Sequence, residues 1–415
     1  MNACLRFIAT AAAIGAFVAP ALTLWAAPAF AAAPGTDATA AVVIDAPAFA
    51  AAAASADGSA AATPAETEDE LVLTVRSSPA AELYTQLVVR DRTLWTAVAE
   101  GTERLGAPGR PFVGDVFVTL RAQGRESTFA EDARGALYRL PDYASVPLGA
   151  EARSKLARYA EAARSRHYGE FTPWSEADRL LPNKSRFTVT DLETGLSFRA
   201  QRRAGGEHAD VQPLTRRDAK IMKAIYGGKW SWDRRAVVVG KDGRSFAASM
   251  NGMPHGGDGI PGNGFAGHFC IHFEGSATHG SGKVDAAHQW MVHKAAGRTD
   301  AYLSRATPGQ LADVFLAAVR TKDEQTLKLL YANPGDEQIA DWLRFQDDLA
   351  PVRRRDRSIE EPPADALAFD LETEVRLYRR GESGSEGAAL AFAFRRASVA
   401  DGWRIEHVEI CCQGR

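Results

Sequence analysis

The stretch Gly267–Phe273 reads "GHFCIHF" and places a histidine two positions to either side of a cysteine. A β-strand projects every second side chain to the same face. If the run is a strand, His268, Cys270 and His272 therefore share one face. Three explanations fit that arrangement: a cysteine nucleophile with its base, a metal site, or core packing.

The segments around this stretch predict a β-rich domain. Residues 254–267, "PHGGDGIPGNGFAG", contain six glycines and form a loop whose backbone can approach another group closely. Residues 186–203 alternate in the manner of two strands around the turn Glu193-Thr194-Gly195. Residues 234–253 do the same around Asp242-Gly243. The cysteine stretch therefore lies among predicted hairpins.

Length, composition and charge limit the number of domains and exclude some classes of protein. The chain of 415 residues is long enough for two or three domains, since domains commonly contain about 100–200 residues. The net charge of -3 argues against a nucleic-acid binder, which usually carries a basic patch. Four cysteines are too few for a disulfide scaffold.

The N-terminal residues have the pattern of a secretory signal peptide. Arg6 precedes the apolar run Phe7–Trp25, and Ala29-Phe30-Ala31 supplies a small-x-small cleavage site. A retained single-helix anchor is the alternative, because the apolar run is near the lower spanning limit of roughly 17–20 residues. No later segment is apolar enough to span a bilayer. We therefore expect a secreted, envelope or periplasmic protein whose mature chain has no membrane span.

The chain divides by composition into a leader and three modules, so we expect an α+β multidomain protein. A central mostly-β, catalytic-like domain is flanked by α+β modules. The C-terminal module, with helices followed by strands, resembles the NTF2-like or cystatin-like fold. The expected boundaries are signal peptide 1–31, Ala-rich disordered leader 32–69, N-terminal α+β module 70–170, β-rich domain 171–300 and C-terminal module 305–415.

Histidines gather around the cysteine stretch, and this predicts a functional site in the β-rich domain. Seven of the nine histidines fall between residues 208 and 293. A cysteine thiol has a pKa of about 8.5 and needs activation, for instance by histidine, to react near neutral pH. His268, two residues away, and His255, in the glycine-rich loop, are the candidate bases for Cys270. Backbone amides near Cys270 and in that loop are the expected donors to a developing oxyanion.

The sequence "MPHGGDGIPGNGFAGHFCIHF" (residues 253–273) resembles the catalytic segment of L,D-transpeptidases (YkuD-like domains). That family has a His-Gly pair after a strand, a loop of variable length, and then a Gly-Cys-Ile/Val-Arg segment rich in Ser and His. His255-Gly256 match the pair, and His268, Cys270 and Ile271 match the second segment. The similarity covers residues 235–295, which are 61 positions of this chain. It implies a cysteine acyltransferase that acts on peptidoglycan stem peptides or another envelope peptide and needs no cofactor.

Three positions depart from the family pattern. Gly267 replaces the usual Ser, Phe269 the Gly before the cysteine, and His272 the Arg after the isoleucine. A bulky Phe beside the nucleophile changes the backbone freedom available for an oxyanion hole. His replaces the Arg as a clamp only when it is charged. The resemblance therefore implies a divergent member, in which cross-linking has shifted to another acyl transfer or been lost.

Two alternatives to the acyltransferase remain open. Zinc is the first, as in a zinc-dependent murein peptidase, with ligands drawn from His208, His255, His268 and His272, and with Cys270 and His279 as further candidates. Three ligands from one straight strand converge poorly, so ligands from other segments would have to contribute. A non-catalytic wall-binding protein is the second. For the cysteine site itself, the residues expected to bind substrate or support the catalytic groups are Gly256, Gly267, His272, Asp210 and His208.

Overall fold

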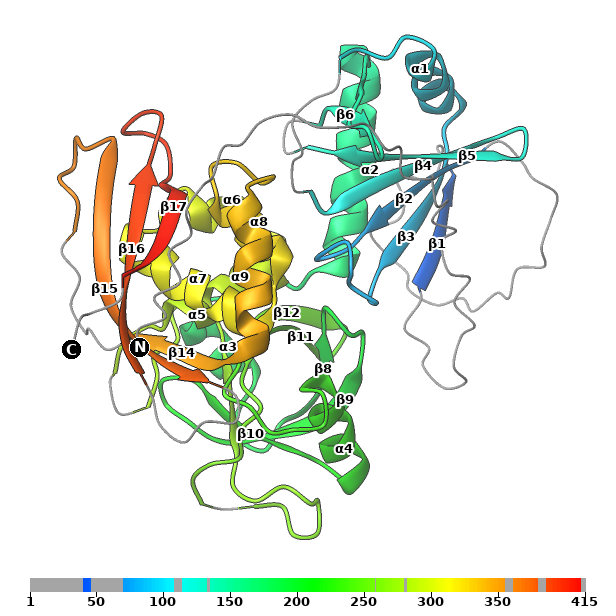
Figure 1. Ribbon diagram of the computed structural model, residues 1–415. Coiled ribbons are helices and arrows are strands. Elements are labelled where there is room, and N and C mark those ends of the chain that lie inside the picture. The colour runs from blue at the N-terminus through cyan, green and yellow to red at the C-terminus, as the bar shows by residue number, and fades with distance from the viewer. Residues whose placement is uncertain are drawn as a thin grey trace.

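The protein, seen here as a computed structural model, has an α+β multidomain fold built on three sheets, of which one closes into a barrel (Figure 1). The structure describes residues 40–45, 70–107, 114–132, 135–257, 259–279, 282–354, 361–379 and 386–411. The expected signal peptide and most of the expected leader lie outside these residues.

The first module contains a seven-stranded sheet in the order β1-β3-β2-β4-β5-β6-β7, in which only the β1–β3 pair is parallel. Two helices accompany the sheet. The elements are β1 (Ala40–Asp45), β2 (Glu70–Val75), β3 (Thr85–Arg90), α1 (Arg92–Thr102), β4 (Val116–Ala122), β5 (Arg125–Glu131), β6 (Leu137–Arg139), β7 (Ser145–Val146) and α2 (Ala150–His167).

Two sequence expectations for this module have different outcomes. The sequence of residues 149–169 predicts a basic amphipathic helix, and this helix is α2, which packs on β2 and β3. Its buried stripe includes Leu156, Tyr159, Ala160 and Ala163, as its periodicity predicts. The expectation of a fully disordered leader is wrong at Ala40–Asp45, which forms strand β1. That hexapeptide, "AAVVID", has the β-branched run that strands favour.

The central module is a closed barrel in the order β10-β13-β12-β11-β8-β9. All of its strand pairs are antiparallel. Both predicted hairpins are present, and Asp242 and Gly243 adopt the positive φ angles (50° and 76°) of a tight hairpin turn. The elements are α3 (Trp174–Leu180), β8 (Arg186–Asp191), β9 (Ser197–Ala204), β10 (Ala209–Pro213), α4 (Arg216–Ile225), β11 (Arg235–Lys241), β12 (Arg244–Met250) and β13 (Phe269–His272).

Side chains of the barrel strands alternate between an apolar interior and the outer face. The interior cluster includes Phe269, Ile271 and Phe273 from β13 and the residue that follows it, and Ala209 and Val211 from β10. Alternate residues of a strand point to opposite faces, so the residues between these apolar ones point to the outer face of the barrel. This alternation puts the polar residues of both strands on the outside of the barrel.

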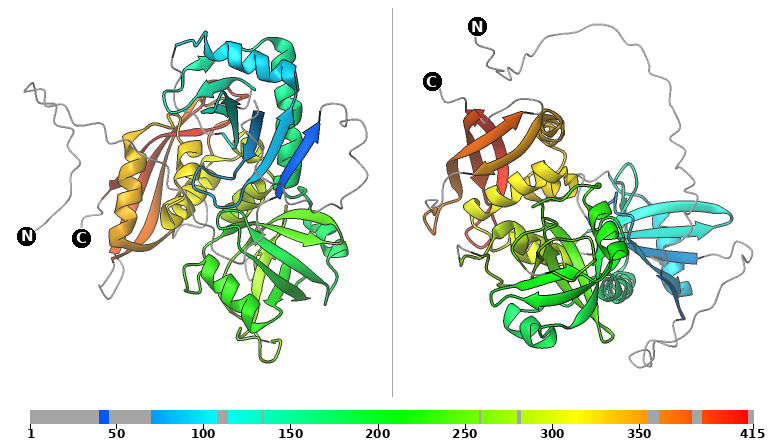
Figure 2. Two further views of the ribbon diagram at one scale, coloured as in Figure 1. Left: turned by 90° about the vertical axis from the view of Figure 1, so that its right-hand side faces the viewer. Right: turned by 90° about the horizontal axis from the view of Figure 1, so that it is seen from below.

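The C-terminal part consists of five helices followed by an antiparallel sheet in the order β14-β15-β16-β17. Figures 1 and 2 show the helices between that sheet and the barrel. The sequence predicts a helical stretch within residues 307–332 that Pro308 begins, and the structure has two helices there, the first of which starts with a capping box at Thr307 and Gln310. The elements are α5 (Ala286–Ala295), α6 (Thr299–Leu303), α7 (Pro308–Thr321), α8 (Glu324–Leu330), α9 (Glu337–Asp348), β14 (Leu349–Arg354), β15 (Ala368–Arg379), β16 (Glu386–Arg395) and β17 (Arg404–Cys411).

Helix α5 joins the barrel to the C-terminal helices. It packs on β11, β12 and β13 on one side and on α6 and α7 on the other. Its Lys294 is buried and lies 2.8 Å from Glu193 Oε1, in the β8–β9 turn, and 2.9 Å from Asp323 Oδ2, before α8. One buried cation therefore binds carboxylates from two modules. None of the helices in the described ranges is both long and apolar enough to cross a bilayer.

Replacing Lys294 by methionine should destabilise the folded protein. The substitution leaves Glu193 and Asp323 without their cation, and breaking a buried ion pair in this way lowers the free energy of unfolding by about 3–5 kcal/mol. Urea unfolding measures the change. The matched control is Lys328→Met in α8, whose pair with Glu324 is exposed; a change of at most about 0.5 kcal/mol is expected there. Equal effects of the two substitutions would contradict the role of Lys294.

Candidate functional site

The candidate site lies on the outer face of the barrel, where β10 and β13 run side by side. In their antiparallel register, Asp210 lies opposite Cys270, with Ala209 opposite Ile271. His268 precedes β13 and forms a two-way backbone bridge with His255 from the glycine-rich loop. The predicted strand therefore exists over Phe269–His272, and the loop is paired against its start.

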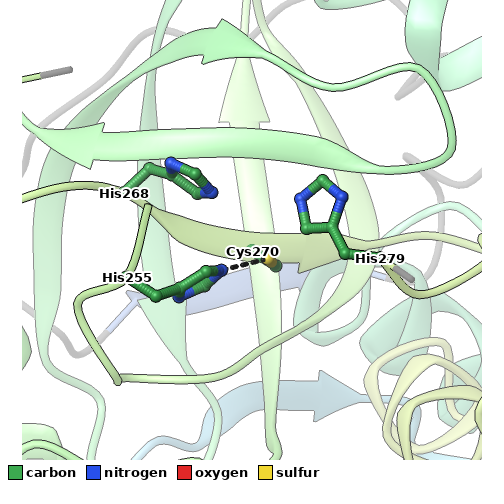
Figure 3. Close-up of side chains that lie close together, drawn as sticks. All are labelled: His255, His268, Cys270 and His279. Carbon is green, nitrogen blue, oxygen red and sulfur yellow. Dashed lines mark hydrogen bonds between the residues drawn. The ribbon is translucent and has the colours of Figure 1, made fainter. Parts of the chain in front are cut away.

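Cys270 and His255 are in direct contact. The Cys270 sulfur lies 3.2 Å from His255 Nε2, and His255 Nδ1 lies 2.8 Å from the carbonyl oxygen of Met253. A carbonyl oxygen only accepts, so Nδ1 carries the ring proton of neutral His255. Nε2 is then the acceptor for the thiol proton. Figure 3 shows the His255 ring directed at the sulfur.

Two glycines permit the close approach of these segments. Both have positive φ angles, 67° at Gly256 and 85° at Gly267. A Cβ on Gly256 would lie 2.4 Å from His268 Cε1, and one on Gly267 would lie 2.2 Å from the carbonyl oxygen of His255. Glycine is therefore required at both positions for the loop to pair with the strand.

The glycine-rich loop is held against the end of β10 by a buried amide. Gln212 donates to the carbonyl oxygen of Gly267 and accepts from the backbone amide of Ile260. Asn263 adds a bond from its Nδ2 to the carbonyl oxygen of Pro213, at 2.9 Å. These bonds fix the loop that carries His255, although its described residues between the two bridge residues form no helix or strand.

Asp210 is the acidic centre of the cluster. Its Oδ1 lies 3.0 Å from His279 Nε2, 3.4 Å from His208 Nε2 and 3.5 Å from His268 Nε2. Burial acts to raise the pKa of Asp210. Hydrogen bonds from His208 and His279, with the charges of nearby histidines, outweigh burial and lower the pKa to about 2. Asp210 is therefore a carboxylate at neutral pH.

The Cys270 thiol is a weak acid in this environment. Burial, and then the charge of Asp210, raise its pKa to about 12, while a hydrogen bond with the Asn251 side chain acts in the opposite direction. The thiol is consequently protonated at neutral pH before any substrate binds. It becomes nucleophilic only when its proton moves to an acceptor such as His255.

A stack of imidazole rings extends from the site toward α5. His208 stacks on His272 with 4.4 Å between centroids, and His272 stacks on His288 with 3.8 Å. His288 ends the stack, with Nδ1 2.8 Å from Ser249 Oγ. Burial lowers the pKa of His272 and of His288 well below the usual value. These two rings are therefore neutral packing residues at neutral pH.

The structure brings most of the sequence-predicted site residues together. His255, His268 and Cys270 lie in one cluster with His279, and a second set of His208, Asp210, Cys270 and His279 overlaps it. In each set the ligand atoms all lie within 4.8 Å of one another. His272, proposed as a ligand for zinc, belongs to neither set, because its ring is stacked between His208 and His288.

Three side chains of the site were not singled out in the prediction of catalytic and support residues. His279 lies in the loop before α5, and Asn251 follows β12; only the folded chain brings them to Cys270. Trp232 is 39% exposed, and its ring centroid lies 4.8 Å from that of His255. It covers one side of the candidate base. Trp230, by contrast, packs edge-to-face on Phe265 at 5.1 Å.

No protein-family model matches the chain, and the search of curated proteins finds no significant relative.

Replacing Asp210 by asparagine should make Cys270 more acidic. The substitution removes a negative charge within 4.8 Å of the sulfur, and a nearby like charge is one of the causes of the raised thiol pKa. Each unit of lowered pKa gives tenfold more thiolate, so alkylation by iodoacetamide at pH 8 should accelerate by roughly tenfold. Mass spectrometry of the Cys270 peptide measures the rate. Asp142→Asn, remote and exposed, is the control. An unchanged or slower rate would refute the electrostatic explanation.

Replacing His288 by glutamine should make folding less sensitive to acid. Its pKa is lowered on folding, so the unfolded chain takes up the proton first and stability is lost as the pH falls below about 6.5. One such histidine contributes a slope of about 1.4 kcal/mol per pH unit in that range. Urea unfolding between pH 7 and 5 measures the slope, with exposed His407→Gln as the control. The test is the slope of the free energy of unfolding against pH, and not the free energy itself. A slope that His288→Gln leaves unchanged would contradict the lowered pKa of His288.

Proposed function

We propose that the protein is an exported cell-envelope protein whose barrel domain carries out cysteine-dependent acyl transfer on peptidoglycan stem peptides, in the manner of an L,D-transpeptidase. The observation that supports this most directly is the 3.2 Å contact between the Cys270 sulfur and His255 Nε2. His255 has its other nitrogen fixed by Met253. The nucleophile Cys270, its base His255 and the Met253 carbonyl group that orients the base therefore form one continuous chain of contacts.

In the proposed reaction, His255 takes the thiol proton as the sulfur attacks a peptide carbonyl carbon. A C–S bond forms, and the carbonyl oxygen becomes an oxyanion. Collapse of this intermediate breaks the C–N bond, and protonated His255 gives its proton to the departing amine. An acceptor amine then attacks the thioester; its proton returns through His255 to the sulfur, which leaves as the thiol. No oxidant or cofactor is required.

The contacts favour His255 over His268 as the base. Of the imidazoles in the described residues, only that of His255 makes a hydrogen bond to the sulfur. His268 packs edge-to-face on His255, with 4.5 Å between ring centroids, and so restricts the orientation of that ring. Asn251 contributes a hydrogen bond to the sulfur and stabilises developing thiolate. In this assignment, Cys270 and His255 are catalytic and His268 is a positioning residue.

The pattern of charge is consistent with a nucleophile that is switched on by its substrate. A raised thiol pKa protects Cys270 from oxidation in an oxidising compartment, since the thiolate is the reactive form. The hydrogen bond to His255 provides the route for the proton once an acyl carbon is in reach. The enzyme would thus react with an oriented peptide carbonyl more readily than with small oxidants.

Incubation with a carbapenem or with stem tetrapeptides tests the proposal. Wild-type protein should form a covalent adduct of the acyl mass on the Cys270 peptide, detected by mass spectrometry. Cys270→Ala should form none, and His255→Gln should react 10²- to 10⁴-fold more slowly, the usual contribution of a general base. Cys411→Ser is the matched control, because Cys411 is the other described free cysteine, and should react like wild type.

Either of two results would refute the acyltransferase and support a different function. Peptide hydrolysis that is lost with a chelator and restored by zinc would indicate the zinc-dependent murein peptidase. No adduct and no turnover, with equal binding of wild type and Cys270→Ala to murein sacculi, would indicate a wall-binding protein.

A further inference from the structure

We propose that His255, His268, Cys270 and His279 also form a binding site for one Zn²⁺ ion. This inference does not depend on acyl transfer: it concerns metal binding by the folded chain, whether or not the thiol is a nucleophile. Three imidazoles and one thiolate are a ligand set typical of tetrahedral zinc. Figure 3 shows the three rings arranged around the cysteine.

The spacing of the donor atoms fits a single ion. All four ligand atoms lie within 4.8 Å of one another. With bonds of about 2.0–2.3 Å, adjacent ligands of tetrahedral zinc are roughly 3.4–3.7 Å apart. The 3.2 Å between the Cys270 sulfur and His255 Nε2 is already close to that separation. Modest rotations of the rings therefore suffice to complete the tetrahedron.

The ligands come from separate segments, which removes the objection to three ligands on one strand. His255 is in the glycine-rich loop, His268 and Cys270 are at the start of β13, and His279 is in the loop before α5. The backbone bridge between His255 and His268 fixes two of the segments against each other. A preformed site of this kind loses little conformational entropy on binding.

The outer nitrogens of two of the rings are held as in known zinc sites, where a ligating histidine donates its other N–H to a carbonyl or carboxylate. His255 Nδ1 is bonded to the Met253 carbonyl oxygen at 2.8 Å. In His279, Nε2 is the nitrogen that faces the other ligands, and it lies 3.0 Å from Asp210 Oδ1 (Figure 3). His268 interacts with the main chain at Gly257.

A buried nitrogen independently points to a ligand at this position. His268 Nε2 is shielded from solvent and makes no hydrogen bond with any described residue. Such atoms are uncommon in folded proteins, because leaving a buried polar atom unpaired costs about 1–3 kcal/mol. A Zn²⁺ ion bound to Nε2 would satisfy it.

The charges also balance. The ion would carry two positive charges, the Cys270 thiolate one negative charge, and Asp210 a second negative charge beside the ligands. Asp210 Oδ1 already lies within 3.5 Å of a ring nitrogen of His208, His268 and His279, and the set that includes Asp210 leaves out His255, whose Nε2 contacts the sulfur. For this reason we favour the set with His255 and His268 over the set with His208 and Asp210.

Zinc and substrate would compete if the proposed acyl transfer is correct. Binding would take the lone pair of His255 Nε2 and the sulfur of Cys270 together, so neither would be available as base or nucleophile. The metal-bound form would therefore be inactive in acyl transfer. This consequence rests on the proposed function; the binding site itself does not.

Metal titration of the full-length protein tests the site. Protein stripped with a chelator should bind one equivalent of Zn²⁺ by calorimetry, and one equivalent of Co²⁺ should give a near-ultraviolet sulfur-to-cobalt absorption band. Cys270→Ala should lose the band. His279→Ala should weaken Zn²⁺ binding by more than the roughly 10- to 100-fold that loss of an outer partner costs. His407→Ala, an exposed histidine in β17, should bind like wild type.

These measurements distinguish three outcomes: absence of the zinc site, misfolding of a variant, and absence of acyl-transfer activity. His279 is the most exposed of the three imidazoles, with a side chain 53% exposed, so its removal should spare the fold; metal-free His279→Ala should still be alkylated at Cys270. Zn²⁺ should protect Cys270 from iodoacetamide in wild type but not in His279→Ala. Less than one equivalent bound, or equal affinity in Cys270→Ala, would overturn the inference. Zinc binding without any acyl adduct would leave it standing and refute only the acyltransferase.

Discussion

The register between β10 and β13 is the constraint on which the candidate site depends. Asp210 lies opposite Cys270, and the residues on either side of each point into the apolar interior of the barrel. A slip of one residue would exchange the two faces and place Cys270 in the core. Phe269 and Ile271 oppose such a slip, because it would expose both side chains to the outer face. The apolar core of the barrel thus determines which polar groups meet outside it.

The carboxylate of Asp210 has two opposing effects on the site, and any function that uses Cys270 must overcome one of them. The carboxylate gathers the histidines, yet its charge and the burial of the sulfur keep Cys270 protonated. Two events can remove that proton near neutral pH: transfer to His255 in the presence of an electrophile, or displacement by a metal cation. The proposed acyl transfer and the proposed zinc binding are therefore alternative uses of one arrangement, and the hydrogen bond from His255 Nδ1 to the Met253 carbonyl oxygen would serve both.

Local patterns in the sequence predict the elements of the fold better than their assembly. Both hairpins and the buried stripe of α2 follow from spacing and turn chemistry, and the structure contains each of them. Cys270, His255 and His268 were predicted as one site because they lie within sixteen residues. His279 belongs to the cluster of histidines noted in the sequence, but its contact with Asp210 depends on the loop before α5, and Asn251 carries no local signal because only the closed barrel brings it to Cys270. The strand spacing placed His272 beside Cys270 correctly, but only the tertiary structure shows that α5 buries its ring.

Helix α5 connects the candidate site to the rest of the molecule. Its N-cap Asp285 accepts from the amide of His288 and pairs with Arg234, just before β11, at 2.8 Å. One turn further, His288 closes the imidazole stack, and at the other end Lys294 binds carboxylates from the barrel and from the C-terminal helices. A shift of α5 would therefore move the stack that packs behind His208 and, through it, the histidines around Asp210. Helix α5 thus connects helices α6 and α7 to the imidazole stack, because it packs on those helices and contributes His288 to the stack.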